Sequence, residues 1–306
     1  MIVSAQFLRV SDLTVDGLQR VLDLAAAVKV HPKSVAGARL GTQVGLFFEK
    51  PSTRTRVSSE VAVSHLGAHA VVLKADEVGL GKREAVEDVA RVLDRYLDVL
   101  ALRVFDHSNL VTIAEHSKAP VINLLSDIAH PCQALADLQT VAENRPLPGT
   151  VLCYIGDGNN VCNSLMVAGA MTGMHVRVVT PEGYAPSADE IDRASRLAAD
   201  SGGSIFVTES LAEGTDGADV IYTDVWASMG QETEAAERRD AFAGYQVDEK
   251  VLASASDEAI FLHCLPAHRG EEVTHEVMEH QRSKVFDQAE NRMHAFKALL
   301  LHLTEA

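Results

Sequence analysis

Short apolar runs alternate with longer amphipathic segments along the whole chain. Ten runs of three to six residues are rich in Val, Ile, Leu and Phe, and they lie at 44–48, 70–73, 99–104, 121–124, 151–155, 176–180, 204–208, 220–223, 260–264 and 284–286. We expect each run to form a strand. The segments between them place apolar residues three and four positions apart, as at Val86, Val89, Ala90 and Leu93, which predicts helices. Alternating strands and helices are typical of parallel sheets covered by helices, so the sequence predicts an α/β fold.

Two features divide this pattern into two domains. The clearest break is the Pro- and Gly-rich loop at 145–149, because these residues interrupt regular structure. We therefore expect a first domain over 1–147 and a second over 148–289, each built on a mostly parallel sheet covered by helices. The apolar-faced segment 290–303 predicts a helix that returns to the first domain, to which we assign residues 290–306. Near the other end, Ser11 and Asp12 predict the cap of a helix that runs to about Val28.

Composition excludes several classes of protein. At 306 residues, with 47% hydrophobic and 23% charged residues, the chain has the size and balance of a soluble two-domain protein. A net charge of −16 argues against a nucleic-acid-binding protein, which needs a positive surface to displace counterions. The four cysteines show no paired spacing, so we expect neither a zinc site nor a disulfide framework. No apolar run approaches membrane-spanning length and no leader pattern opens the chain, so we expect a cytoplasmic location.

The most informative polar stretch follows the first predicted strand. Ser52, Thr53, Arg54, Thr55 and Arg56 place three hydroxyls and two guanidinium groups at the start of a predicted helix. A helix start offers unused backbone N–H groups and a partial positive charge, hydroxyls add donors, and arginine can bind two oxyanion oxygens at once. The stretch therefore indicates a site for phosphate or a similar dianion. Ser52 as an ordinary helix cap beside solvated arginines is the alternative.

Further polar residues follow other predicted strands, where α/β proteins collect their ligands. They are His130 and Gln133 after the fourth run, Asn160 after the fifth, Asp224 after the eighth, Cys264 at the end of the ninth and Arg292 before the last helix. Each alone has an ordinary explanation, such as a buried small thiol for Cys264 or a surface charge for Arg292. If they converge, the first domain supplies an oxyanion-binding half. The second supplies a half that suits an amine or a zwitterion.

A dinucleotide-dependent oxidoreductase is the rival from another chemical class. It rests on Gly156 and Gly158 after a predicted strand, with Glu182 at a plausible distance for a ribose contact. The fingerprint lacks its third glycine, because Val161 stands in that place. A non-catalytic ligand-binding protein is a second alternative, since an anion-binding loop can persist without catalysis.

Several motifs together resemble those of the ornithine carbamoyltransferases. The match runs over essentially the full length, with Ser-Thr-Arg-Thr-Arg at 52–56, Asp-x-Ala-Arg-Val-Leu at 88–93, His-Pro-Cys-Gln at 130–133, Ala-Asp-Leu-Gln-Thr at 136–140, Asp-x-x-x-Ser-Met-Gly at 224–230, His-Cys-Leu-Pro at 263–266 and Phe-Asp-x-Ala-Glu-Asn-Arg at 286–292. Aspartate carbamoyltransferases share the first signatures but have neither Ser-Met-Gly nor His-Cys-Leu-Pro. The resemblance implies transfer of the carbamoyl group of carbamoyl phosphate to the side-chain amine of L-ornithine, giving citrulline and phosphate in arginine metabolism.

The resemblance also implies roles for individual residues. The phosphate of carbamoyl phosphate is expected at Ser52, Thr53, Arg54, Thr55 and Arg103, and its carbonyl end at His130, Gln133 and Arg292. The α-amino and α-carboxylate groups of ornithine are expected at Asn160, Asp224, Ser228 and Met229. Cys264 and Leu265 are expected beside the ornithine side-chain nitrogen, where they also contact carbamoyl phosphate. Cys264, Arg54, Arg103 and His130 are the residues expected to act in catalysis.

The same resemblance implies a homotrimer or a higher multiple with active sites at subunit interfaces, and neither a metal nor another cofactor. Gly79 departs from the pattern, because most members carry a Gln there that reaches the neighbouring subunit's site. Gly79→Gln is then expected to tighten carbamoyl phosphate binding, provided that the loop tolerates a side chain there and that Lys82 does not already fill the role. A carbamoyltransferase for another amine, such as putrescine, stays open as the alternative within the class.

Overall fold

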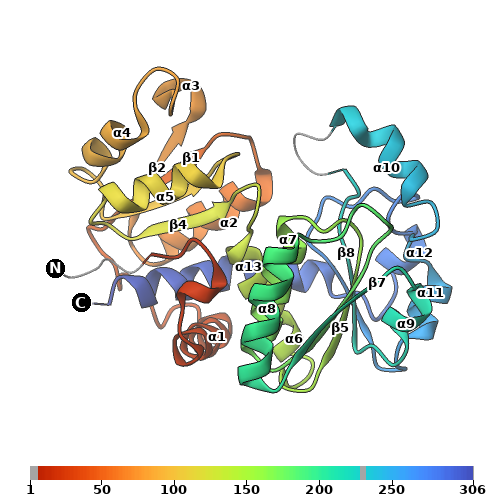
Figure 1. Ribbon diagram of the computed structural model, residues 1–306. Coiled ribbons are helices and arrows are strands. Elements are labelled where there is room, and N and C mark those ends of the chain that lie inside the picture. The colour runs from red at the N-terminus through yellow and green to blue at the C-terminus, as the bar shows by residue number, and fades with distance from the viewer. Residues whose placement is uncertain (1–5, 228–231, 306) are drawn as a thin grey trace. The chain divides into compact units, whose positions relative to one another are not determined.

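The computed structural model describes residues 6–227 and 232–305. The chain divides into two compact units, one made of Met1–Gln139 with Glu290–Ala306 and the other of Thr140–Ala289. Each unit is built on its own parallel sheet covered by helices, as the hydrophobic pattern predicts (Figure 1). Over the described residues, no helix combines the length and the apolar character that crossing a bilayer requires.

The sheet of the first unit has four parallel strands in the order β2-β1-β3-β4. These strands are β1 (Gln43–Phe48), β2 (His69–Lys74), β3 (Val99–Arg103) and β4 (Val121–Leu125). All residues of β3 and β4 are buried, which is why both read as continuous apolar runs. The register of the pairing between β3 and β4 shifts between Leu102 and Arg103, so the ladder is irregular at Arg103, the last residue of β3.

Helices surround this first sheet. They are η1 (Val10–Asp12), α1 (Val15–Val30), α2 (Thr53–His65), α3 (Ala75–Val78), α4 (Val86–Leu93), α5 (His107–His116), most of α6 (Pro131–Ala142) and most of α13 (Val285–Leu303). The C-terminal helix α13 lies beside α1 (Figure 1). Lys29 Nζ donates to Asn291 Oδ1 at 2.8 Å, and Arg39 Nη2 donates to the Leu301 carbonyl at 2.8 Å. The return of the last helix to the first unit is therefore confirmed.

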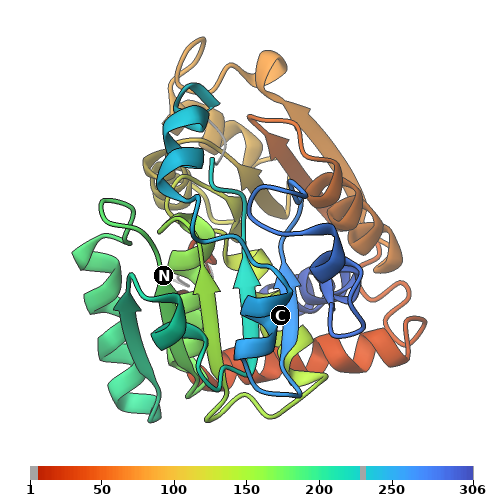
Figure 2. The same ribbon diagram turned by 90° about the vertical axis from the view of Figure 1, so that its right-hand side faces the viewer.

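The sheet of the second unit has five parallel strands in the order β7-β6-β5-β8-β9, which run side by side in Figure 2. They are β5 (Val151–Ile155), β6 (His175–Val179), β7 (Ser204–Thr208), β8 (Val220–Thr223) and β9 (Ile260–His263). Its helices are α7 (Asn160–Met171), α8 (Ala188–Ser201), α9 (Leu211–Thr215), η2 (Glu232–Glu234), α10 (Ala235–Ala241), α11 (Glu249–Ser254) and α12 (His275–Met278).

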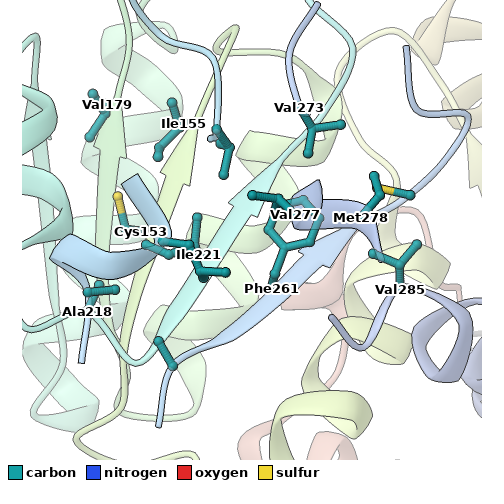
Figure 3. Packing of buried hydrophobic residues seen from close by; sticks show 14 residues of the cluster. Cys153, Ile155, Val179, Ala218, Ile221, Phe261, Val273, Val277, Met278 and Val285 are labelled. Atoms are coloured by element: carbon teal, nitrogen blue, oxygen red, sulfur yellow. The ribbon is translucent and has the colours of Figure 1, made fainter. Parts of the chain in front are cut away.

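Apolar side chains from neighbouring strands form the core on one face of the second sheet. Ile155 of β5, Ile221 of β8 and Phe261 of β9 belong to one hydrophobic cluster. Val277 and Val285 belong to the same cluster (Figure 3). All five are inaccessible to solvent. This packing holds the strand ends in fixed positions, because a close-packed core transmits displacement rather than absorbing it.

Nine predicted strands lie within one residue of the observed ones at each end, and the tenth is wrong. At 284–286 there is no strand, since Ser283 makes a single bridge to Phe261 and α13 begins at Val285. The last helix thus starts before residue 290, because so short an apolar run does not distinguish a strand from a helix start. The first helix is capped by Thr14 rather than Ser11, and Thr14 Oγ1 accepts from Gly17 N at 3.0 Å.

The division between the units falls inside α6 and near the start of α13. The Pro- and Gly-rich loop at 145–149 lies between α6 and β5. The domain limits given from the sequence, 1–147 with 290–306 and 148–289, stay a prediction.

Lys297 on α13 carries a buried charge in the first unit. Its side chain is inaccessible to solvent, and its Nζ has no hydrogen-bond partner within the described ranges. Burial lowers the pKa of Lys297 from 10.5, because the ammonium loses its hydration. Burial, and then the charge of Lys297, also lower the pKa of His65. An unsatisfied buried ammonium costs free energy of folding.

We expect Lys297→Met to raise the free energy of unfolding by about 1–3 kcal/mol, since methionine fills a similar volume without an unsatisfied donor. The pKa of Lys297 is lower in the folded state than in the unfolded state, so the wild-type protein becomes more stable as the pH rises from the folded-state pKa to the unfolded-state pKa. The stability advantage of Lys297→Met should therefore be smaller at high pH. Urea unfolding at about pH 7 and about pH 10 measures both effects. Lys29→Met, which takes a donor from Asn291, is the control and should destabilise. A destabilised Lys297→Met at the lower pH would contradict this account.

Candidate active site

Both sheets contain a point where the strand order reverses, and predicted site residues lie at these points. In the first sheet the chain runs from β1 to β2 on one side and then crosses to β3 on the other side of β1. In the second sheet it runs from β5 through β6 to β7 and then crosses to β8 on the other side of β5. Loops that leave neighbouring strands in opposite directions open a crevice at the carboxyl ends. Ser52 follows β1 and Arg103 ends β3, while Asn160 begins α7 after β5 and Asp224 follows β8.

The start of α2 has the geometry of an anion-binding loop. Ser52 is the N-cap, and its Oγ accepts from Thr55 N at 3.4 Å. Thr53 and Arg54 follow in the first turn, where backbone N–H groups have no acceptor within the helix. The first turn contains no acidic residue that would compete for them. Ser52 is therefore a cap, and this role is compatible with an anion at the same helix start.

Two buried arginines converge on Thr55. Arg292 Nη2 donates to Thr55 Oγ1 at 2.7 Å, and Arg103 Nη1 donates to the same oxygen at 3.4 Å. Arg103 and Arg292 are each 7% exposed, and Thr55 is 1% exposed. The three side chains come from β3, α13 and α2, so only the fold brings them together. Two guanidinium groups on one neutral hydroxyl concentrate positive charge in a buried place, which favours a bound anion.

The same arginines act on His130, which lies in the loop between β4 and α6 and is 4% exposed. Burial lowers the pKa of His130 well below 6.5, and the charges of Arg292, Arg103 and Arg54 lower it further. The ring is therefore neutral near neutral pH, with one nitrogen a donor and the other an acceptor. Beside three arginines, a neutral imidazole can donate to a carbonyl oxygen without adding a further charge.

The first turn of α6 carries the other three residues of the His-Pro-Cys-Gln motif, of which Cys132 and Gln133 have polar side chains. Gln133 is 1% exposed, and its Nε2 donates to Asp137 Oδ1 at 2.8 Å, one turn further along the helix. Cys132 is also buried, its Sγ donates to the Asn123 carbonyl at 3.4 Å, and burial raises its pKa to about 12. Cys132 is therefore an inert thiol of the core rather than a nucleophile.

A cavity of about 510 Å³ adjoins the start of α2 in the first unit. Ser52 and Thr53 line it together with Phe48, Glu49, Pro51, Arg56, Val72, Lys74, Ala75 and Asp76. Ser52 and Thr53, two of the three hydroxyl residues predicted to bind phosphate, thus border open space large enough for a small ligand.

The structure corrects the expectation for residue 79. Gly79 has a left-handed backbone with φ 64°, and a Cβ built there would lie 2.7 Å from the Cβ of Arg83. Both the conformation and the contact disfavour a side chain at this position. Gly79→Gln is therefore expected to strain the loop rather than to tighten ligand binding.

In the second unit, Asp224 joins two strand-end loops. Its Oδ2 accepts from Asn159 Nδ2 at 2.9 Å, and its Oδ1 accepts from the thiol of Cys264 at 2.9 Å. Asp224 is 5% exposed and Cys264 is 9% exposed. Because the thiol donates to a carboxylate, it is protonated in this arrangement. Each carboxylate oxygen keeps a second lone pair, which suits an ammonium group.

Asn159 is a site residue that the sequence analysis missed. Its Oδ1 caps α7 by accepting from Val161 N at 2.9 Å and Cys162 N at 3.1 Å, so one amide starts the helix and orients Asp224. The signal was available, because asparagine before a helical segment is a preferred cap. The predicted Asn160 is the next residue and the first of α7. The predicted Ser228 and Met229 lie outside the described residues.

A buried ion pair was also missed. Arg238 Nη1 lies 2.9 Å from Asp157 Oδ2 and donates to the Trp226 carbonyl at 3.0 Å. Burial raises the pKa of Asp157, and the charge of Arg238 opposes that rise. Arg238 thereby ties the loop after β8 to the end of β5. No local pattern marks it, because it stands in a stretch of charged residues that reads as an exposed helix face.

His263, which precedes Cys264, is held by both ring nitrogens. Its Nδ1 accepts from Leu265 N at 2.8 Å, so its Nε2 carries the proton and points to Glu272 Oε1 at 3.1 Å. The side chains of His263 and Glu272 are both inaccessible to solvent. Leu265 has φ 61°, a conformation that is uncommon for a residue other than glycine. The buried pair therefore fixes the turn that presents Cys264 and Leu265.

Asp224, His263 and Cys264 each have a potential metal-ligand atom, and these three atoms lie within 4.8 Å of one another. This set does not suit a metal ion as it stands. Both nitrogens of His263 are already hydrogen-bonded, and Asp224 and Cys264 are bonded to each other. A metal ion needs a deprotonated thiolate and one available imidazole nitrogen, so it would have to displace the thiol–carboxylate bond and one of the two His263 bonds.

The glycine pair after β5 has a packing explanation. A Cβ at Gly158 would lie 2.2 Å from Pro186 N, and Gly158 N donates to the Tyr184 carbonyl at 2.8 Å. The glycine thus permits a close approach to the protein's own backbone. A dinucleotide site would instead need that approach for its pyrophosphate. The feature that favoured an oxidoreductase therefore has another cause.

Comparison with known proteins gives a consistent result over nearly the whole chain. Residues 5–143 match the family model described as the carbamoyl-P binding domain of aspartate/ornithine carbamoyltransferase, and residues 148–303 match its Asp/Orn binding domain. The ornithine carbamoyltransferase of Acidothermus cellulolyticus is 51% identical over 98% of this chain and 96% of its own length. The anabolic ornithine carbamoyltransferase of Pyrococcus furiosus is 49% identical over 94% of this chain and 93% of its own length.

Solved structures agree. The ornithine carbamoyltransferase structure from Pyrococcus furiosus matches with a TM-score of 0.95 and 46% identity, covering 98% of this chain and 97% of that one. The structure from Thermus thermophilus matches with a TM-score of 0.89 and 44% identity, covering 98% and 99%. The family models together span both units, and the relatives are similar along their full length. This chain therefore belongs to the aspartate/ornithine carbamoyltransferase family.

Proposed function

We propose that this protein transfers the carbamoyl group of carbamoyl phosphate to the side-chain amine of L-ornithine, which yields citrulline and phosphate. Membership of the family and relatives named ornithine carbamoyltransferase at 51% and 49% identity support the proposal. The observation that carries it is the convergence of Arg103 and Arg292 on Thr55, beside a His130 that burial and arginine charges keep neutral. This arrangement supplies cationic donors for a phosphate and a neutral donor for a carbonyl.

The first unit is proposed to bind carbamoyl phosphate. Ser52, Thr53 and Thr55, with the Arg54 and Arg103 guanidinium groups, would hold the phosphate and stabilise the negative charge that grows on it as the C–O bond breaks. His130 and Arg292 would donate to the carbonyl oxygen, which gains negative charge when the amine attacks. Gln133 would bind the amide group of the same ligand.

The second unit is proposed to bind ornithine. Asp224 would accept from the α-ammonium group, with Asn160, Ser228 and Met229 completing the site for the amino-acid head group. Cys264 and Leu265 would lie beside the side-chain amine, which must be neutral to attack. A buried, protonated thiol favours the neutral amine, since it offers no negative charge that would stabilise the ammonium form.

Assembly, location and pathway are also proposals. A cytoplasmic homotrimer with active sites at the subunit interfaces is supported by the motif resemblance. A role in arginine biosynthesis is supported by the anabolic relative from Pyrococcus furiosus. Light scattering on the purified protein tests the oligomeric state, and a monomer with full activity would contradict interface sites.

Citrulline formation from carbamoyl phosphate tests the proposed reaction directly. With a panel of amines, ornithine should be carbamoylated with a kcat/KM about 10⁴-fold above putrescine, which lacks the α-carboxylate. Lysine should also be poor, because one added methylene moves its amine past the carbonyl carbon. Higher activity with putrescine than with ornithine would support the alternative that the protein is a carbamoyltransferase for another amine. Binding of carbamoyl phosphate without turnover of any amine would support a non-catalytic protein.

A further inference from the structure

Gln133 and Asp137 form a buried pair on one face of α6. Each side chain is 1% exposed, and Gln133 Nε2 lies 2.8 Å from Asp137 Oδ1. Residues four positions apart on a helix are neighbours, so the pair forms within a single rigid element. The motif resemblance implies a place for Gln133 at the carbamoyl end of the substrate, but it implies no role for Asp137.

The chemistry of the pair fixes which way the Gln133 amide points. An ionised carboxylate can only accept hydrogen bonds, whereas an amide donates from its nitrogen and accepts at its oxygen. The amide nitrogen must therefore face Asp137, and the amide oxygen is turned to the other side. Within the described ranges, this oxygen is buried and has no hydrogen-bond partner. A buried acceptor of this kind is costly unless a donor reaches it.

Carbamoyl phosphate offers a donor at the corresponding place. Its carbonyl carbon carries an oxygen, which accepts hydrogen bonds, and an NH₂ group, which donates them. His130 and Arg292 are donors, so they suit the carbonyl oxygen, and the amide oxygen of Gln133 is an acceptor, so it suits the NH₂ group. A flipped Gln133 would present its own NH₂ group to that of the ligand and could not bind it.

We propose that Asp137 is a positioning residue that holds the Gln133 amide in the orientation that accepts from the carbamoyl NH₂ group. The proposal rests on the proposed function. It makes the pair a specificity device, since acetyl phosphate carries a methyl group where carbamoyl phosphate carries NH₂. With acetyl phosphate bound, the oxygen of Gln133 stays unsatisfied, which is how sites built for an N–H donor reject isosteric analogues.

Asp137→Asn tests the orientation with almost no change in shape. An asparagine can both donate and accept, so the Gln133 amide can flip. We expect kcat/KM for carbamoyl phosphate to fall about 5- to 30-fold, since a charge-assisted bond is replaced by a neutral one and one orientation is unproductive. The inhibition constant of acetyl phosphate should change by less than about 3-fold, and KM for ornithine should stay near the wild-type value. Asp137→Ala should show the same selectivity with a larger loss.

A double-mutant cycle separates positioning from a general structural role. If Asp137 acts through Gln133, Asp137→Asn should have no further effect on carbamoyl phosphate in a Gln133→Met background. Asp94→Asn is the matched control in the same unit, because Asp94 Oδ1 accepts from Ser117 Oγ, Lys118 N and Ala119 N. It should lower stability and leave the ratio of carbamoyl phosphate to acetyl phosphate unchanged.

Two results would overturn the inference. One is an equal loss for carbamoyl phosphate and acetyl phosphate in Asp137→Asn, and the other is an undiminished loss in the Gln133→Met background. Failure of the proposed function is recognised separately, since wild-type protein would then form no citrulline. In that case calorimetric binding of the two acyl phosphates to wild type and Asp137→Asn still measures the same selectivity.

Discussion

δ-Aminovalerate, which is ornithine without its α-amino group, is expected to be carbamoylated with a kcat/KM about 10³- to 10⁴-fold below that of ornithine. The reason is the environment of the Asp224 carboxylate, which is 5% exposed and accepts hydrogen bonds from Asn159 Nδ2 and from the Cys264 thiol, each at 2.9 Å. When δ-aminovalerate binds, this buried carboxylate gains no cation. An uncompensated buried charge costs several kcal/mol, about the size of the expected effect.

Asp224→Asn should remove most of this discrimination by lowering the activity with ornithine far more than that with δ-aminovalerate. Putrescine should lose activity as ornithine does, because it retains the second amino group. Asp219→Asn is the matched control at the opposite end of β8, where Asp219 pairs with Arg145 and accepts from Val151 N. It should lower stability without changing the ratio of the two substrates. Steady-state kinetics with each amine measures the ratio, and equal activity of wild type with both would exclude Asp224 as the α-ammonium site.

Arg54→Ala is expected to lower kcat/KM for carbamoyl phosphate by about 30- to 1,000-fold, or roughly 2–4 kcal/mol of transition-state stabilisation. Arg54 stands in the first turn of α2, next to the Ser52 cap and to Thr55, on which Arg103 and Arg292 converge. Its interaction with phosphate strengthens as charge moves to the leaving group, so kcat should fall as well as KM rise. Near wild-type turnover at saturating carbamoyl phosphate would mean that Arg54 is only structural.

The same variant should also shift the pH dependence in a defined direction. The Arg54 charge is one of three that, after burial, lower the pKa of His130. Removing a positive charge favours the protonated ring, so the pKa of His130 should rise towards 6.5. If activity needs the neutral ring, the acidic limb of the pH–rate profile should therefore move to higher pH in the variant. Arg91→Ala is the control, because Arg91 pairs with Asp88 on the surface of α4 and is 58% exposed. It should change neither the rate nor the pH profile.

Local patterns in the sequence predicted most strands and the polar cap at the start of α2 with little help from tertiary structure. A buried strand of a parallel sheet reads as a short apolar run because both of its faces are covered, as in β3 and β4. The Ser52 cap of α2 was equally predictable, because a serine directly before a helical segment is a preferred N-cap. Local patterns failed at two places. At 284–286 the short apolar run is compatible with both a strand and a helix start, and near the N-terminus both Ser11 and Thr14 could cap the first helix.

The partners of the site residues could not be predicted in this way. Nothing local joins Arg238 to Asp157, and both are ordinary charged residues in the sequence. The same is true of His263 and Glu272, whose pairing depends on the fold of the segment that follows β9. Burial decides their chemistry, because a charge or hydrogen bond gains strength and specificity only where water is excluded.

The sequence by itself determined the α/β class, the motifs that place the chain in its family and the residue types available for an anion and an amine. These follow from interactions between neighbours in the chain, such as helix caps and apolar periodicity. Only the tertiary structure decided that Arg103 and Arg292 share Thr55, that His130 is neutral and that Asp224 holds the Cys264 thiol. The physical reason is that each depends on contacts and desolvation between segments up to 237 positions apart, which no local pattern encodes.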